Sequence, residues 1–298
     1  MKKHSLKKSI LASLAIVPLA ALLAGCAGGA GSEAETETVR IGVAGASDEY
    51  WQTYVEAAAD EGITVELVDF SDYNQPNPAL TEGEIDLNQF QHTIFLAQYN
   101  VANDQDLVPI GATAIYPLGL YSTKYQDVED IQDGETVAVP NDPTNLSRGL
   151  LVLQSAGLIE LEDGGSAYST LDDVDTEASR VKVTELDAAL TATSLPDVAA
   201  AIVNNDYIKD AGLEAADAIA QDDPSDPNAL PYANIFAARA EDKDNETYKK
   251  LVEIYQNTKA VTDGVIENSG GTAVMLTTPV EELEESLATV QKQIEEQG

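Results

Sequence analysis

Residues 140–148, which read PNDPTNLSR, have the composition of a carboxylate-binding site. They follow a strand-like run and open a leucine-rich helix that we expect to end near Gly157, with Asp142 or Thr144 as its cap. Backbone N–H groups at a helix start attract anions, and Arg148 adds a guanidinium that can hold a carboxylate by two hydrogen bonds. An isolated arginine more often pairs with a surface acid. Because basic residues are scarce and the turn is rich in anion-site features, we predict that Arg148 binds a carboxylate.

Aromatic and amide side chains gather in a second cluster. It covers residues 70–78 (FSDYNQPNP) and residues 88–92 (NQFQH), the latter at the end of a predicted strand. Rings combined with amides suit an apolar ligand side chain that must be both buried and oriented. Phe90 and His92 are therefore candidates, although a single histidine is more often structural than ligand-binding.

Three asparagines complete the candidate set. Asn204 and Asn205 follow the strand-like run 198–203, and Asn234 opens another such run. Their side-chain carbonyls can accept hydrogen bonds from an ammonium group. Asparagine at a strand end is equally typical of turns, so the residue types alone leave both interpretations open.

The elements that must position these groups alternate between strands and helices. Strand patterns occur at 39–44, 63–67, 85–90, 107–116, 136–139, 181–183, 198–203 and 234–238, and helical patterns at 51–62, 248–255 and 280–294. Strand, helix and strand in close succession indicate βαβ units, and we therefore expect an α/β fold with parallel sheets covered by helices.

Two strand-like segments interrupted by proline or glycine look like crossings between lobes. They are residues 116–121 (YPLGLY) and 231–234 (PYAN). Two crossings make the first lobe discontinuous, with residues 39–116 plus 235–298 in lobe 1 and residues 117–234 in lobe 2. We expect the ligand cleft to lie between these lobes.

Composition excludes several classes of protein. The chain holds 52 acidic and 16 basic residues, for a net charge of −36, which argues against nucleic-acid binding. Its single cysteine allows no internal disulfide and no cysteine-based zinc site, and nothing in the sequence implies a metal or a cofactor. Without a G-x-S-x-G motif, a hydrolase built on His92 remains a minor alternative, as does a surface adhesin.

The N-terminal region has the pattern of a secretory signal. Four lysines precede an apolar run from residue 10 to residue 23, which is too short to span a membrane, and the run ends in LAGC at Cys26. We expect residues 1–25 to be a signal peptide and Cys26 to carry a lipid anchor. Residues 26–38 are small and polar and are predicted to form a flexible tether.

The combination of motifs resembles the NlpA family of methionine-binding lipoproteins, the solute receptors of methionine ABC importers. The resemblance rests on the lipobox and on residues 70–80, 88–92, 119–122, 140–148, 156–159, 185–189 and 231–234, in family order from the lipobox almost to the C-terminus. It implies a two-lobed periplasmic-binding-protein fold, a role without catalysis, an extracytoplasmic location on the bacterial membrane, and ABC permease and ATPase partners.

The resemblance also implies a ligand set. Arg148 would bind the carboxylate of methionine, while Asn204 and Asn234 would lie near its amino group. The remaining contacts would come from Tyr73, Phe90, His92, Tyr116 and Asn145.

Two departures from the family pattern bear on the ligand. Ile94-Phe95-Leu96 stands where the family usually has Pro-Tyr-Leu, and Asp206 interrupts an Asn-Gly-Asn-Tyr pattern. The acid can repel a carboxylate or attract an ammonium. A methionine-containing dipeptide, methionine sulfoxide and another amino acid therefore remain alternative ligands.

Overall fold

The computed structural model describes residues 38–226 and 229–297, which belong to one compact unit. The predicted signal peptide, tether and Cys26 anchor lie outside the described residues. The α-helices are α1 (Glu49–Asp60), α2 (Pro76–Thr81), α3 (Thr93–Asn103), α4 (Pro143–Ser155), α5 (Ala188–Thr191), α6 (Glu246–Asn257), α7 (Lys259–Asn268) and α8 (Val280–Gln297). The site also involves the 3-10 turns η5 (Asn205–Tyr207) and η8 (Leu230–Tyr232).

The strands form two five-stranded sheets and a short two-stranded one. The first sheet has the order β2 (Thr64–Asp69), β1 (Thr38–Val43), β3 (Leu87–His92), β11 (Asn234–Ala238) and β4 (Val108–Ala112). The second has the order β10 (Ala220–Gln221), β6 (Gly119–Tyr121), β9 (Ala200–Val203), β7 (Thr136–Pro140) and β8 (Lys182–Leu186). Strand β12 (Val274–Met275) pairs with β5 (Ala114–Ile115). The strands on either side of each predicted crossing therefore belong to different sheets.

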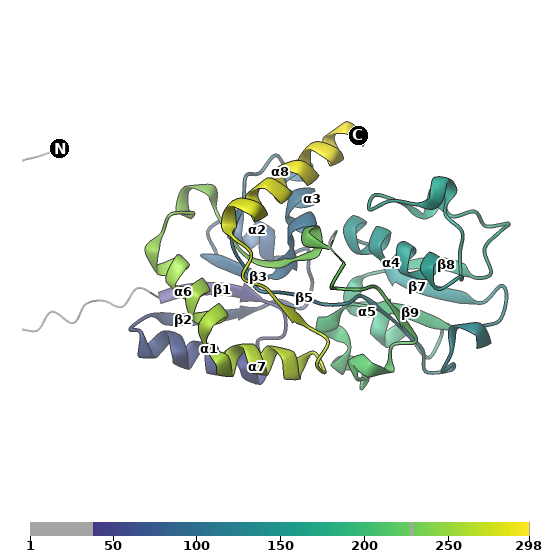
Figure 1. Ribbon diagram of the computed structural model, residues 1–298, viewed down its shortest axis with the longest axis horizontal. Helices are drawn as coiled ribbons and strands as arrows, with labels where there is room; N and C mark the ends of the chain where they lie inside the picture. The colour runs from purple at the N-terminus through teal and green to yellow at the C-terminus, as the bar shows by residue number, and fades with distance from the viewer. Residues whose placement is uncertain (1–37, 227–228, 298) are drawn as a thin grey trace, which may run out of the picture. The chain divides into compact units, whose positions relative to one another are not determined.

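Alternation along the strands gives the first sheet two apolar faces. On β11, Phe236 and Ala238 pack in one core with the β1 residue Ile41, whereas Ile235 and Ala237 pack in another. Successive side chains of a strand point to opposite faces, which is why neighbours along β11 separate in this way. Helices α1, α6 and α7 contribute to the first core, and helices α2, α3 and α8 to the second (Figure 1).

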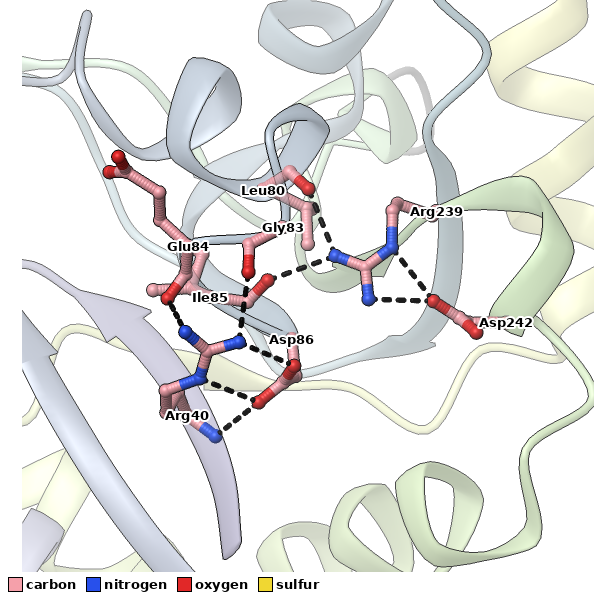
Figure 2. Close-up of polar contacts among 8 residues, drawn as sticks. All are labelled: Arg40, Leu80, Gly83, Glu84, Ile85, Asp86, Arg239 and Asp242. Carbon is pink, nitrogen blue, oxygen red and sulfur yellow. Dashed lines mark hydrogen bonds and ion pairs between the residues drawn. The ribbon is translucent and has the colours of Figure 1, made fainter. Parts of the chain in front are cut away.

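Two arginines hold the turn that leads from α2 into β3 (Figure 2). The guanidinium of Arg40 donates to both carboxylate oxygens of Asp86, at 3.2 and 3.0 Å, and to the carbonyl oxygens of Gly83 and Glu84. From the other side, Arg239 donates to the carbonyl oxygens of Leu80 and Ile85, at 3.0 and 2.9 Å. These bonds satisfy turn carbonyls that have no strand partner, and they fix the start of the strand that carries Phe90 and His92.

Within the two five-stranded sheets, the expectation of parallel pairing is wrong at two strands, and the short β5–β12 pair is also antiparallel. Strands β1, β2 and β3 pair in parallel, as do β7, β8 and β9. Strand β11 is antiparallel to β3 and β4, and β6 is antiparallel to β9 and β10. Each reversed strand is the first in its sheet after a crossing. A chain arriving directly from the other sheet, without a helical crossover, enters its new sheet at the opposite end and so runs in the opposite direction.

Helix boundaries follow the local sequence. Asp142 caps α4 by accepting a hydrogen bond from the Asn145 amide at 2.9 Å, as predicted, and Gly157 follows the helix with φ of +70°. Asp48 occupies the cap position of α1 without a side-chain cap bond. No helix in the described part of the chain is long and apolar enough to cross a membrane.

Candidate functional site

One cavity of about 40 Å³ brings together all eight residues predicted to contact a ligand. Its walls come from strands β3 and β11 of the first sheet, from helix α4, and from residues that border β6 and β9 of the second sheet. The lining residues are Tyr73, Phe90, Gln91, His92, Phe95, Tyr116, Pro117, Leu118, Asn145, Arg148, Asn204, Asn205, Asp206 and Asn234. The structure therefore places the predicted set in one site, and contact of each residue with a ligand stays a prediction.

Strand pairing aligns three of these residues. Phe90 and His92 are two positions apart on β3, so their side chains leave the same face of the strand. Asn234, the first residue of β11, lies opposite His92 in the ladder. His92 also ends β3 and caps α3, because its Nδ1 accepts a hydrogen bond from the Phe95 amide at 3.2 Å. The cap holds the imidazole in one orientation at the cavity wall.

Arg148 is 6% exposed, and its guanidinium is already bound on one edge. Its Nε donates to Asp222 Oδ2 at 2.6 Å, and its Nη2 donates to Asp222 Oδ1 at 3.1 Å and to the Tyr116 carbonyl at 2.8 Å. The Tyr232 ring packs against the guanidinium, whose central carbon lies 4.4 Å from the ring centroid. The edge formed by Nε and Nη2 thus holds Asp222. Nη1 is the guanidinium nitrogen left for a carboxylate, since it has no hydrogen bond to a described residue.

A chain of side-chain hydrogen bonds orients the polar end of the cavity. The buried Asp142 carboxylate accepts both bonds from Asn145 Nδ2, at 3.0 and 3.1 Å, so that Asn145 Oδ1 must face away from it. That oxygen accepts a 3.0 Å bond from Asn204 Nδ2. The geometry leaves Asn204 Oδ1 buried and without a hydrogen-bond partner among the described residues. Because a buried acceptor without a donor is costly, Asn204 Oδ1 is suited to receive a donor from a ligand.

His92 is held as a neutral imidazole. Its Nδ1 is an acceptor, so the proton sits on Nε2, which lies 3.4 Å from Asn145 Oδ1. Burial, together with the nearby Arg148 charge, lowers the pKa of His92 to about 3, and the hydrogen bond to Asn145 opposes this shift. A protonated histidine would be a second cation beside Arg148, and burial disfavours it.

We predict that His92 lowers the free energy of unfolding in acid. Since its pKa is about 3 in the folded protein and 6.5 in the unfolded chain, the unfolded chain binds one more proton between these values, and stability falls as the pH drops. From pH 7 to pH 4, wild type should lose roughly 3 kcal/mol more unfolding free energy than His92→Gln. Urea unfolding of both proteins at each pH measures this difference.

The comparison with His92→Gln isolates this effect from an opposing one. Asp206 has a pKa raised to about 6, chiefly by desolvation, so it favours the folded state as the pH falls toward 4. Both proteins retain Asp206, and its contribution cancels. Equal losses in the two proteins would show that His92 is not held neutral.

Tyr73 and Asp206 lie together in the cavity lining, and the Asp206 carboxylate supplies its negative charge. The Tyr73 hydroxyl donates to Asp206 Oδ2 at 2.7 Å. Asp206 is the one carboxylate among the described lining residues, and it keeps access to solvent. Desolvation raises its pKa, the negative charge of Asp48 adds to this, and hydrogen bonds from Tyr73 and Asn205 oppose it. A guanidinium and a carboxylate that line the same cavity match a zwitterion.

Aromatic rings enclose the rest of the cavity. Tyr73 and Phe90 have ring centroids 5.8 Å apart, and Phe95 meets Phe90 edge-on at 5.7 Å. Tyr207 packs against Tyr73 at 5.1 Å. Such rings provide polarizable edges for an apolar or thioether side chain.

Sequence reasoning did not include several lining or neighbouring residues in the site. Phe95 and Asp206 had a signal, because both stand where the chain departs from the family pattern. Asp222 had none, since it is one of 52 acidic residues and lies far from Arg148 along the chain.

In the described part of the chain, no group of three or more histidine, cysteine, aspartate or glutamate side chains is arranged to hold a metal.

The chain is similar to several known proteins. The D-methionine-binding lipoprotein MetQ of Escherichia coli K12 is 40% identical over 230 residues, covering 76% of this chain and 83% of the relative. The crystal structure of protein PG110 from Staphylococcus aureus has a TM-score of 0.80 at 36% identity and covers 85% of this chain and 99% of its own. A nutrient-binding protein from Burkholderia cenocepacia, bound to methionine, has a TM-score of 0.74 at 37% identity and covers 80% and 99% of the two chains.

These similarities confirm the predicted α/β fold of a periplasmic substrate-binding protein, which is also the description of a related Coxiella burnetii structure with a TM-score of 0.74 at 35% identity. The family model described as NlpA lipoprotein matches residues 39–276. The resemblance noted in the sequence is thereby confirmed, and the chain belongs to the NlpA lipoprotein family.

Proposed function

We propose that this protein is an extracytoplasmic receptor that binds methionine, as the L- or D-isomer, and delivers it to an ABC importer. The observation that carries the proposal is the pairing of charges and acceptors in one aromatic-lined cavity. Arg148 offers Nη1 for a carboxylate, and Asn204 Oδ1 is a buried acceptor without a donor among the described residues. The methionine-bound relative and the relatives named as D-methionine-binding lipoproteins support this choice of ligand.

The ammonium group of the ligand would lie between acceptors. Asn204 Oδ1, the Asn234 side chain and Asp206 line the same cavity, and all three can accept hydrogen bonds or attract positive charge. The thioether side chain would pack among Tyr73, Phe90 and Phe95. His92, Tyr116 and Asn145 would complete the wall, with His92 as a neutral donor through Nε2.

We propose that the receptor consists of two lobes and binds its ligand without catalysis. The proposed lobe 1 comprises residues 39–116 and 235–298, and lobe 2 comprises residues 117–234, with the sheets divided accordingly. We propose that Cys26 carries the lipid that anchors the protein to the membrane, and that permease and ATPase subunits receive the ligand. The family name and the lipoprotein relatives support the anchor.

Calorimetric titration of the purified protein tests the ligand. L-methionine, D-methionine, methionine sulfoxide and Gly-Met are titrated separately, at low and high salt. We expect saturable binding of at least one methionine isomer. Tighter binding of the sulfoxide or the dipeptide would mean that this compound, and not methionine, is the ligand. Binding of none of the four by a folded protein would refute the proposal.

A further inference from the structure

Asp222 is the side chain that decides how Arg148 faces the cavity. It accepts from both Nε and Nη2 of Arg148, at 2.6 and 3.1 Å, which is the paired geometry a free carboxylate would otherwise adopt with the guanidinium. The Tyr116 carbonyl accepts a further bond from Nη2 at 2.8 Å. Of the three guanidinium nitrogens, only Nη1 therefore lacks a partner among the described residues.

Backbone structure fixes Asp222 in turn. It follows β10, and its amide donates to the Leu118 carbonyl at 3.3 Å, just beyond the pairing of β10 with β6. Its Oδ1 accepts from the Leu118 amide at 2.8 Å. Leu118 and Arg148 both line the ligand cavity, whereas Asp222 lines a second cavity of about 200 Å³ that Arg148 also lines. The backbone of Leu118 therefore holds Asp222, and Asp222 does not line the ligand cavity.

We propose that Asp222 is a positioning residue that acts on the ligand through Arg148, holding the guanidinium so that Nη1 alone is presented to the ligand carboxylate. The inference rests on the proposed function. Arg148 is held by three hydrogen bonds and packs against Tyr232, so its side chain loses little conformational freedom when the ligand binds. End-on contact through one nitrogen also makes recognition of the carboxylate depend on the position of that nitrogen.

A double-mutant cycle tests this role by calorimetry with the full purified protein. Asp222→Ala should weaken methionine binding by about tenfold, because a loosened guanidinium must be ordered on binding. In an Arg148→Ala background the same substitution should change affinity less than twofold, since its effect passes through the guanidinium. Methioninamide, which lacks the carboxylate, should lose no affinity on Asp222→Ala.

Controls separate this role from a general structural one. Asp223→Ala removes a neighbouring acid that bonds Ser225 instead of Arg148, and it should bind methionine as wild type does. Asp222→Glu, which keeps the carboxylate, should recover part of the affinity. If Asp222→Ala does not fold, the isosteric Asp222→Asn takes its place, because its amide nitrogen cannot accept from Nε.

The outcomes are distinguishable. Absence of methionine binding by wild type refutes the proposed function. Binding by wild type that is unchanged or tightened in Asp222→Ala refutes the positioning role and leaves the function standing. An equal loss for methionine and methioninamide, or an equal loss with and without Arg148, also refutes it.

Discussion

Arg148→Ala is expected to weaken methionine binding by about 2 to 5 kcal/mol, the range for truncating one member of a buried charged pair. The Arg148 side chain is only 7% exposed. A ligand carboxylate that binds it therefore loses its hydration water and is compensated by one fixed cation. Removal leaves the ligand carboxylate in a cavity whose remaining charged group is Asp206. Calorimetric titration of the variant with methionine measures the change.

Arg180→Ala is the matched control for this prediction. Arg180 also forms an ion pair with an aspartate, Asp133, at 3.3 Å, but its side chain is 35% exposed and does not line the ligand cavity. Its removal should leave methionine affinity unchanged, because Arg180 does not line the ligand cavity. The loss of an exposed ion pair should also change folding stability little. Wild-type affinity in Arg148→Ala would show that the carboxylate binds elsewhere.

Asn145→Ala is expected to lower the unfolding free energy by about 3 kcal/mol even without ligand, because it removes the centre of a buried polar network. The Asn145 amide joins the Asp142 carboxylate to Asn204 and lies beside His92 Nε2. Alanine removes the two hydrogen bonds that Asp142 accepts from Asn145 Nδ2. Burial already raises the pKa of Asp142, opposed by these hydrogen bonds, so their loss should raise it further.

Urea unfolding followed by circular dichroism measures that change, with Asn141→Ala as the control. Asn141 lies in the same turn but is exposed, and its replacement should alter stability by less than about 0.5 kcal/mol. Methionine affinity should also fall in Asn145→Ala, since the Asn204 amide loses the bond from its Nδ2 to Asn145 that orients its Oδ1. Equal stability of the two variants would mean that the network carries little energy.

Most of the fold follows from local patterns. The β1 strand was expected at 39–44 and spans Thr38–Val43, and α6 was expected at 248–255 and spans Glu246–Asn257. Hydrophobic periodicity and helix-capping residues act over a few residues, so they predict helices and strands without knowledge of packing. The directions of β6 and β11 were not, because direction depends on which end of a sheet the returning chain enters.

The composition of the candidate site was also largely readable. Arg148 was singled out by its place after a capped turn, and Phe90 and His92 by their place at a strand end. Which nitrogen of Arg148 stays free for a ligand could not be read, because a sequence does not show which of many acids reaches a given arginine. Asp222 is 74 residues away along the chain, and only packing brings it to 2.6 Å.

The sequence by itself therefore determined the α/β class, the family and the residue types that gather at the cavity, because these depend on local periodicity and on motifs in a fixed order. The tertiary structure decided which atoms remain free for a ligand. The Asp222 pair leaves Nη1 of Arg148, and the Asp142 and Asn145 chain leaves Oδ1 of Asn204. Hydrogen bonds are short and directional, so their partners are set by the positions of atoms after folding and not by residue type.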